Sequence, residues 1–241
     1  MWMLLDRKVR LILLTASVLI IAAAYLQLAV SRSPPTTTLG LLLQWGSALF
    51  SAVGALSLVI AAIGPWPIVW RATLKIPLAS RLLRFPDVNG VWVGVRSSSY
   101  LNRQAEDAER QPPPPELMQM TIRQSWLSVR VDTTSADERT QSRSLLAFPQ
   151  VTDQGARIWS TYASAVRSPA QTEADSHRGA AVLDINAAGD LISGTYFSDR
   201  GIGRHLPSSG RFELRRLSED PESRPQAAEM SEFVSRHGWG L

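Results

Sequence analysis

Residues 39–63 read LGLLLQWGSALFSAVGALSLVIAAI, and no charged residue interrupts this run. An earlier run, residues 11–30, reads LILLTASVLIIAAAYLQLAV and is also free of charge. Because a helix rises about 1.5 Å per residue, about 20 apolar residues cross the hydrocarbon core of a bilayer. The two runs therefore predict a transmembrane helical hairpin within residues 1–63, with one span at residues 11–30 and one at 39–63.

The charges that flank the two runs predict their orientation. Three basic residues precede the first run and four follow the second within residues 64–86, whereas the connecting loop carries Arg32 alone. Basic residues accumulate on the cytoplasmic side of a membrane, so both termini are expected in the cytoplasm. A signal peptide would need a shorter apolar core and a small-residue cleavage site, and we therefore expect the first run to be retained.

Small residues recur at four-residue spacing in the second run, in one row of Ser47, Ser51 and Ala55 and another of Ala48 and Ala52. Such rows let helix backbones approach closely in lipid. They fit packing within the hairpin and contact between protomers equally well. Neither run contains an acidic or basic residue, which argues against an ion-relay transporter.

The remainder divides by composition into a juxtamembrane linker at 64–86, a domain at 87–217 and a polar tail at 218–241. Prolines interrupt the linker, which is either a simple connection or a segment lying in the membrane interface. Residues 102–116 carry charges and four prolines, which predict a long solvated loop. Much of the tail is expected to be disordered, apart from one short helix near residues 227–236.

In several stretches of the domain at 87–217, aliphatic residues occupy every second position, as in Val91-Trp92-Val93-Gly94-Val95-Arg96. This period is typical of half-buried strands, and turn residues separate several such stretches. The predicted fold class is a membrane protein in which the two-helix hairpin precedes an all-β domain, a small antiparallel β-barrel of about eight strands.

No pattern of an enzyme is present. The chain has no cysteine and three dispersed histidines, and it lacks a phosphate-binding loop, a nucleophile elbow and a dinucleotide fingerprint. We therefore expect no catalytic residue, no metal and no cofactor. The net charge of +4 comes largely from the membrane flanks, so no DNA or RNA polymer is expected as a partner.

Aromatic and arginine residues gather in or beside the predicted strands. Aromatic faces stack on bases and guanidinium groups bind phosphates, so a nucleotide ligand would suit them. Packing of the aromatic rings in the core is the plainer interpretation of each one alone. The groups are Trp126 with Arg123 and Gln124, Trp159 with Tyr162, and Tyr196 with Arg200 and Arg204.

The order of these motifs behind a two-span hairpin resembles the two-transmembrane, β-strand-rich effectors of bacterial cyclic-oligonucleotide-based antiphage signalling systems (CBASS). The resemblance extends over about residues 11–217. It is carried by IRQSW at 122–126 (Q-x-W), SRS at 142–144, Tyr162, HRGAA at 177–181 (H-x-G-x-A), GTYFSDR at 194–200 (G-x-Y-F-x-x-R) and Ser209-Gly210.

The resemblance implies a cytosolic barrel on the bacterial inner membrane that binds a cyclic dinucleotide made by a partner nucleotidyltransferase. Binding would drive homo-oligomerisation of the hairpins and disrupt the bilayer. The expected ligand-binding residues are Arg123, Gln124, Trp126, Tyr162, Tyr196 and Arg200, with Tyr196 or Trp126 stacking on a base and Arg200 or Arg123 meeting phosphate. The loop at Pro112–Pro115 and the tail depart from the family pattern.

Two other functions fit the same architecture. A small barrel can hold one apolar molecule, which would make the chain a membrane-anchored lipid carrier. Alternatively, a strand edge of the domain could bind a partner protein, which would make the chain an adaptor.

Overall fold

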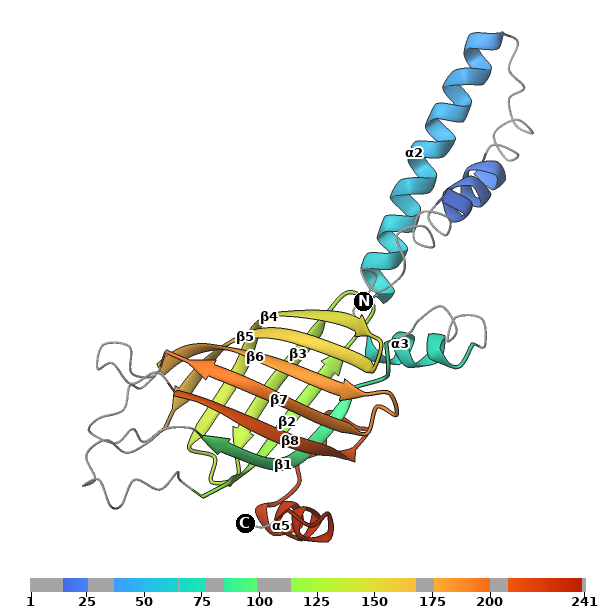
Figure 1. Cartoon of the computed structure of the whole chain (residues 1–241). Helices are drawn as coiled ribbons and strands as arrows, with labels where there is room; N and C mark the ends of the chain where they lie inside the picture. The colour runs from blue at the N-terminus through green and yellow to red at the C-terminus, as the bar shows by residue number, and fades with distance from the viewer. Residues whose placement is uncertain are drawn as a thin grey trace. The chain divides into compact units, whose positions relative to one another are not determined.

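The computed structural model of the chain describes residues 15–25, 37–64, 66–76, 85–98, 114–167, 176–199 and 208–239 (Figure 1). It divides into two units. One contains the N-terminal helices and residues 125–127, and the other contains the sheet and the C-terminal helix. Each is described separately.

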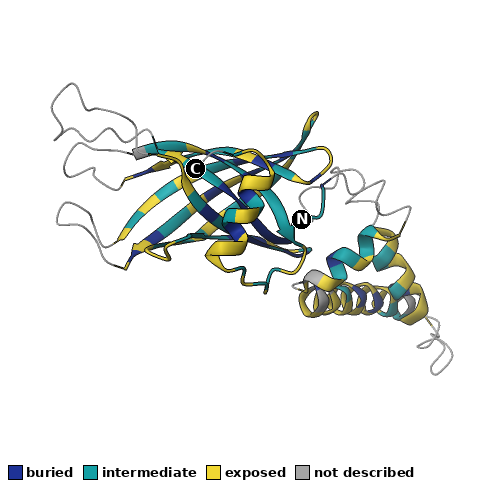
Figure 2. Cartoon of the chain, turned by 90° about the horizontal axis from the view of Figure 1, so that it is seen from below, coloured by how far each residue is buried: buried dark blue, intermediate teal, exposed yellow. Residues whose placement is uncertain are grey.

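Among the described residues of the helical unit, one helix is long and apolar enough to cross a membrane, α2 (Thr38–Ile63). The side chain of Thr37 caps its start, because its Oγ1 accepts a hydrogen bond of 3.1 Å from the amide of Gly40. Most of α2 is exposed, as the yellow colouring in Figure 2 shows. Of the first predicted span, the structure describes a shorter apolar helix, Thr15–Tyr25, and the rest lies outside the described residues.

The two rows of small residues on α2 have different environments. Ala48 and Ala52 are fully buried in a cluster with Ala22 of the first apolar helix. Ser47, Ser51 and Ala55 are exposed. One row therefore packs within the chain, and the other is left open to solvent or lipid.

A short helix, α3 (Pro67–Leu74), follows α2 in the segment predicted as a linker. Proline suits its first turn because that position needs no amide hydrogen. In the same unit Trp126 lies edge-on to the buried ring of Trp70, with 5.5 Å between ring centroids. The indole nitrogen of Trp126 also donates to the hydroxyl of Thr73 at 3.2 Å.

Eight antiparallel strands form the second unit, each paired with the next along the chain, and β8 pairs with β1 to close a barrel. This confirms the predicted barrel. The strands are β1 (Gly90–Ser98), β2 (Glu116–Gln124), β3 (Val129–Ser135), β4 (Thr140–Thr152), β5 (Gly155–Val166), β6 (Ser176–Asn186), β7 (Leu191–Ser198) and β8 (Ser208–Ser218).

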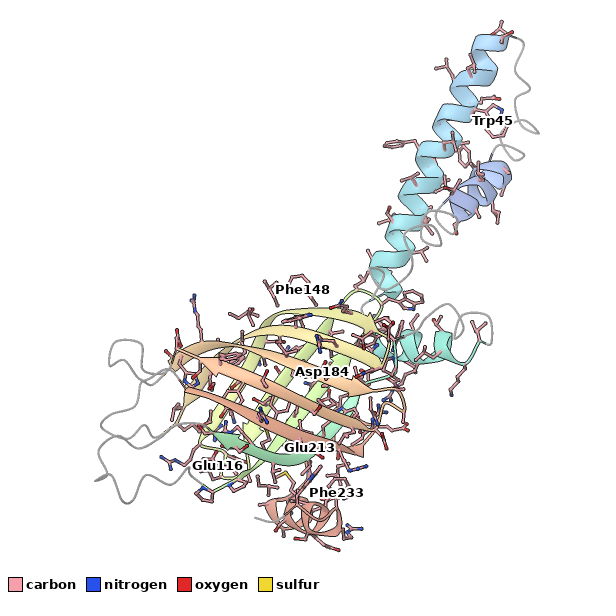
Figure 3. The ribbon with its side chains drawn as sticks, viewed as in Figure 1. Trp45, Glu116, Phe148, Asp184, Glu213 and Phe233 are labelled. Atoms are coloured by element: carbon pink, nitrogen blue, oxygen red, sulfur yellow. The ribbon has the colours of Figure 1, made fainter. Side chains whose placement is uncertain are left out.

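The strand register separates an inner and an outer face. Trp92 lies opposite Met120 of β2 and Arg216 of β8, and Trp92 and Met120 are fully buried inside the barrel. Residues of the opposite parity point outward, where Leu145, Leu146, Phe148, Trp159 and Phe197 are about half exposed. Figure 3 labels Phe148 on this outer wall.

The C-terminal helix α5 (Ala227–Arg236) covers the outer face of β1. Met230 and Val234, one turn apart, are buried against Val91 and Val93. Trp239 follows the helix and donates from its indole nitrogen to Glu213 at 3.2 Å. The short helix was predicted correctly. The disorder expected for much of the tail is not observed over residues 218–239, because Phe233 and Trp239 pack with Met230 and Val234 to dock the helix on β1.

We expect the Met230→Ala substitution to lower the free energy of unfolding of the barrel unit by about 2–3 kcal/mol, since it empties a buried site between α5 and β1. Ser235→Ala, on the exposed side of the same helix, is the matched control and should change the free energy by less than about 0.5 kcal/mol. Urea titration of the full chain in nanodiscs, followed by tryptophan fluorescence, measures both. Equal free energies for the two variants would contradict docking of α5.

Candidate functional site

The barrel interior changes character along its axis. Toward the β4–β5 and β6–β7 turns it is apolar and packed, with large side chains that are fully buried. The guanidinium of Arg216 lies over the Trp92 ring at 4.7 Å from its centroid and donates to the carbonyl of Gly189 at 2.8 Å. The residues that fill this end are Trp92, Met120, Ile122, Ile158, Leu183, Ile192 and Leu214.

The interior at the other end, where β1 ends and β2 begins, is polar. The register places the members of this group on the same inward parity as the apolar residues. We call this group the polar end of the barrel. Its members are Arg96, Glu116, Ser142, Ser144, Tyr162, Ser164, His177, Tyr196 and Ser198.

Two tyrosines of the polar end lie directly against glycines of the next strand. The ring of Tyr162 contacts Gly179 of β6, and the ring of Tyr196 contacts Gly210 of β8. A Cβ atom on either glycine would overlap the ring. The glycines of the H-x-G-x-A and Ser-Gly motifs therefore create the space in which the two rings sit.

Arg96 supplies positive charge at the polar end. Its guanidinium lies 6.0 Å from the centroid of the Tyr196 ring and forms an ion pair with Glu116, the residue directly opposite on β2. Burial alone would lower the pKa of Arg96. The carboxylate of Glu116 and its hydrogen bond more than offset this, so the pKa of Arg96 is raised above its ordinary value.

His177 stands near this pair. Burial lowers the pKa of His177, the positive charge of Arg96 lowers it further, and Asp199 opposes both effects. The imidazole is therefore neutral at pH 7. Its buried Nδ1 has no hydrogen-bond partner among the described residues.

Serine hydroxyls complete the polar end. Ser142 donates to Ser164 across the β4–β5 pair at 3.0 Å, and the hydroxyl of Ser144 accepts from the amide of Val131 at 2.9 Å. The polar end thus combines two aromatic faces, one guanidinium, one neutral imidazole and several hydroxyls. These groups can stack on planar rings, bind an anion and hydrogen-bond to the edges of bases.

The predicted site residues fall in different places. Tyr162 and Tyr196 lie together at the polar end, and the carbonyl of Phe197 accepts a hydrogen bond of 3.1 Å from the Tyr162 hydroxyl. Arg123 points outward from β2, where it pairs with Asp132 at 3.1 Å and Glu222 at 3.0 Å. Arg200 lies outside the described residues.

Gln124 is also apart from the two tyrosines. Gln124 is fully buried at the apolar end, where its side chain accepts from the amide of Val88 at 2.8 Å and donates to the carbonyl of Pro86 at 3.3 Å. Trp126 belongs to the helical unit. The Q-x-W motif thus holds structural contacts.

Sequence reasoning did not select Arg96 or Glu116. Arg96 lies two and four residues after Gly94 and Trp92, so it was the polar member of an inward-facing row. Period two identifies such a row, but it does not say which row faces inward when both sides of β1 are buried. Glu116 follows the prolines at 112–115, and nothing in that stretch of sequence indicates that Glu116 lies opposite Arg96.

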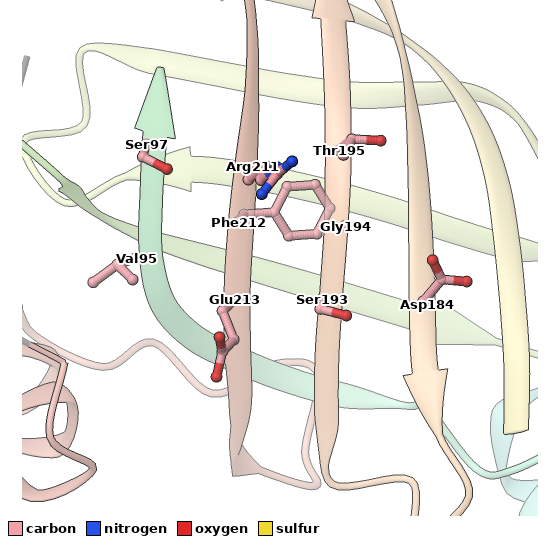
Figure 4. A pocket seen from close by; sticks show the side chains of 9 residues that line it. All are labelled: Val95, Ser97, Asp184, Ser193, Gly194, Thr195, Arg211, Phe212 and Glu213. Carbon is pink, nitrogen blue, oxygen red and sulfur yellow. The ribbon is translucent and has the colours of Figure 1, made fainter. Parts of the chain in front are cut away.

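A shallow groove on the outer wall is a second candidate. Asp184, Thr195, Arg211 and Glu213 line it from neighbouring strands, as Figure 4 shows. These side chains share the outward parity of Val95, and Trp239 bonds to Glu213 at its margin. Two carboxylates face one guanidinium there, which is unfavourable for a multiply charged anion. The polar end is therefore the better anion site.

Comparison with known proteins adds an independent finding. A comparison with curated protein sequences finds no match. Residues 83–216 match the family described as "Cap15, cyclic dinucleotide receptor domain", and this match runs from the start of the barrel unit almost to the end of β8. The chain therefore belongs to the Cap15 cyclic dinucleotide receptor family of CBASS membrane effectors.

Proposed function

We propose that the barrel binds its cyclic dinucleotide at the polar end, and that binding drives the hairpins of several copies together and disrupts the bacterial inner membrane. Arg96 and the two tyrosines, held inside a barrel whose family is a cyclic dinucleotide receptor, are the observation that carries this proposal. Under this proposal Tyr162 and Tyr196 stack on the bases, and a phosphate meets Arg96.

The chemistry of the ligand fits these groups. A cyclic dinucleotide carries two bases and two phosphates, and stacking on an aromatic side chain is worth about 1–3 kcal/mol per base. A guanidinium binds phosphate oxygens in a bidentate manner. Arg200 remains a predicted second phosphate contact, because the same motif that supplies Tyr196 carries it.

The membrane part of the proposal rests on α2 and on the basic flanks. α2 is long enough to cross a bilayer, and the basic flanks predict that the barrel lies in the cytoplasm. Ser47, Ser51 and Ala55 remain exposed on α2 after the other small-residue row packs inside the chain. In our proposal this exposed row lets α2 helices of neighbouring copies approach closely.

The alternatives receive less support. An apolar-ligand carrier needs interior space, yet fully buried side chains such as Trp92 and Leu183 fill the apolar end. An adaptor that binds through a strand edge needs an unpaired strand, yet each of the eight described strands pairs on both sides. The polar end therefore favours a polar, anionic ligand.

We expect Tyr162→Ala and Tyr196→Ala each to weaken binding of a cyclic dinucleotide by about tenfold or more, through loss of one stacking surface. Calorimetric titration of the full chain in nanodiscs with cyclic di-AMP, cyclic di-GMP and cyclic GMP–AMP measures this. Trp159→Ala, on the outer wall, is the matched aromatic control and should leave affinity unchanged.

The same titrations compare the polar end with the residues that the sequence suggested. Arg123→Gln and Trp126→Ala should leave affinity within about twofold of the wild type, since Arg123 pairs with carboxylates on the outer wall and Trp126 packs on Trp70. Loss of binding in these two variants alone, with the tyrosine variants unaffected, would move the site away from the polar end.

Ligand affinity should rise as the pH falls from 8 to 6. His177 is neutral in the free protein because burial lowers its pKa, and a bound anion would favour its charged form and raise that pKa again. Binding then takes up a proton, so lower pH strengthens it. The His177→Gln variant should lose this dependence, whereas His237→Gln, outside the barrel, should retain it. A wild-type affinity that decreases as the pH is lowered from 8 to 6 would contradict this placement of the ligand.

Self-association can be measured by disulfide formation, since the chain has no cysteine of its own. Ser51→Cys should give a cross-linked dimer in nanodiscs or vesicles only after addition of the cyclic dinucleotide that binds tightest. Ala52→Cys, buried against the first helix, is the adjacent control and should not cross-link. Equal cross-linking of Ser51→Cys with and without ligand would contradict ligand-driven association.

A further inference from the structure

Arg96 is already occupied in the structure. Of the described residues that face the polar end, it is the one side chain with a permanent positive charge, because His177 is neutral. Its guanidinium makes an ion pair and hydrogen bond with Glu116. Among the described residues, the charges at the polar end are therefore largely balanced, although its proposed ligand is a dianion.

The two partners of this ion pair differ in their exposure. The Arg96 side chain is 21% exposed, whereas that of Glu116 is 55% exposed at the start of β2 (Figure 3). The carboxylate can therefore turn out into water at small cost, while the guanidinium stays inside beside Tyr196. An incoming anion would replace Glu116 without leaving a charge buried and unpaired.

A carboxylate and a phosphate present similar oxygen pairs to a guanidinium. We infer that Glu116 occupies the phosphate position on Arg96 in the free protein, and that a ligand must displace this carboxylate in order to bind. This inference rests on the proposed function and assigns Glu116 a role in setting the affinity of the site. Glu116 raises the free-energy threshold for every anion that reaches Arg96.

The displacement costs every anion a similar free energy, so its effect on occupancy is largest for ligands that make few other contacts. Inorganic phosphate or a mononucleotide gains one charge contact and at most one stacked base. Its binding free energy therefore offsets only a small part of the cost of displacing Glu116. In our proposal a cyclic dinucleotide stacks on both Tyr162 and Tyr196, so its binding free energy offsets more of that cost. Glu116 thus lowers the affinity of every anion by a similar factor, and anions that make few contacts then fail to occupy Arg96 at concentrations at which a cyclic dinucleotide still binds.

The test is a double-substitution cycle on the full chain in nanodiscs. Glu116→Gln keeps the shape of the side chain and removes its charge, so we expect cyclic dinucleotides to bind about five- to tenfold more tightly. Affinity for AMP and GMP should rise by at least the same factor. The gain should vanish in the Arg96→Gln background, because Arg96 is then absent and nothing is left to be released.

Glu222→Gln is the matched control. Glu222 also pairs with an arginine, Arg123, at 3.0 Å, but on the outer wall. Its substitution removes the same charge from the protein, and it should change affinity by less than twofold. A similar gain in both variants would mean that net charge alone acts at long range, and would overturn the inference.

The remaining outcomes separate this inference from the proposed function. Unchanged or weaker binding by Glu116→Gln, with a wild type that binds, overturns the competition and leaves the receptor site intact. A gain that persists in the Arg96→Gln background also overturns it. If neither the wild type nor Glu116→Gln binds any cyclic dinucleotide tested, the proposed site itself fails, and the inference fails with it.

Discussion

Antiparallel pairing of β8 with β1 closes the sheet on itself, so each of the eight described strands has a hydrogen-bonded neighbour on both sides. Closure encloses one face of every strand, and the inward-facing side chains are then shielded from water. The burial of Trp92, the seating of Tyr162 and Tyr196 on glycines, and the pairing of Arg96 with Glu116 all depend on this enclosure.

The enclosed volume has an apolar end and a polar end, and under the proposed function the first serves stability and the second recognition. At one end, apolar side chains such as Ile158 and Leu183 are fully buried and supply the hydrophobic free energy that holds the barrel together. At the other end, serines, tyrosines and an ion pair replace them. Polar groups add less to stability than apolar packing of the same volume, and such a cost is expected where a site must bind a charged ligand.

The outer surface is divided in a similar way. α5 buries Val91 and Val93 on one arc of the wall, whereas Phe148, Trp159 and Phe197 on β4, β5 and β7 remain exposed. On α2, Ala48 and Ala52 are used within the chain and Ser51 is not. These contrasts bear on the proposed self-association, which would need surfaces that the intramolecular contacts leave open.

The sequence by itself determined the membrane-length helix, the all-β domain, the helix near residues 227–236 and, through the order of short motifs, the family. The length of a hydrophobic run and an alternation with period two are local properties, so they can be recognised in the sequence without knowledge of the fold. Strand register decided which aromatic and basic residues share the barrel interior. Tyr162 and Tyr196 both face inward, whereas Arg123, one position before the inward-facing Gln124, points outward. Arg96 and Glu116, twenty positions apart, became partners only because β1 and β2 align in this register, and no local pattern encodes that alignment.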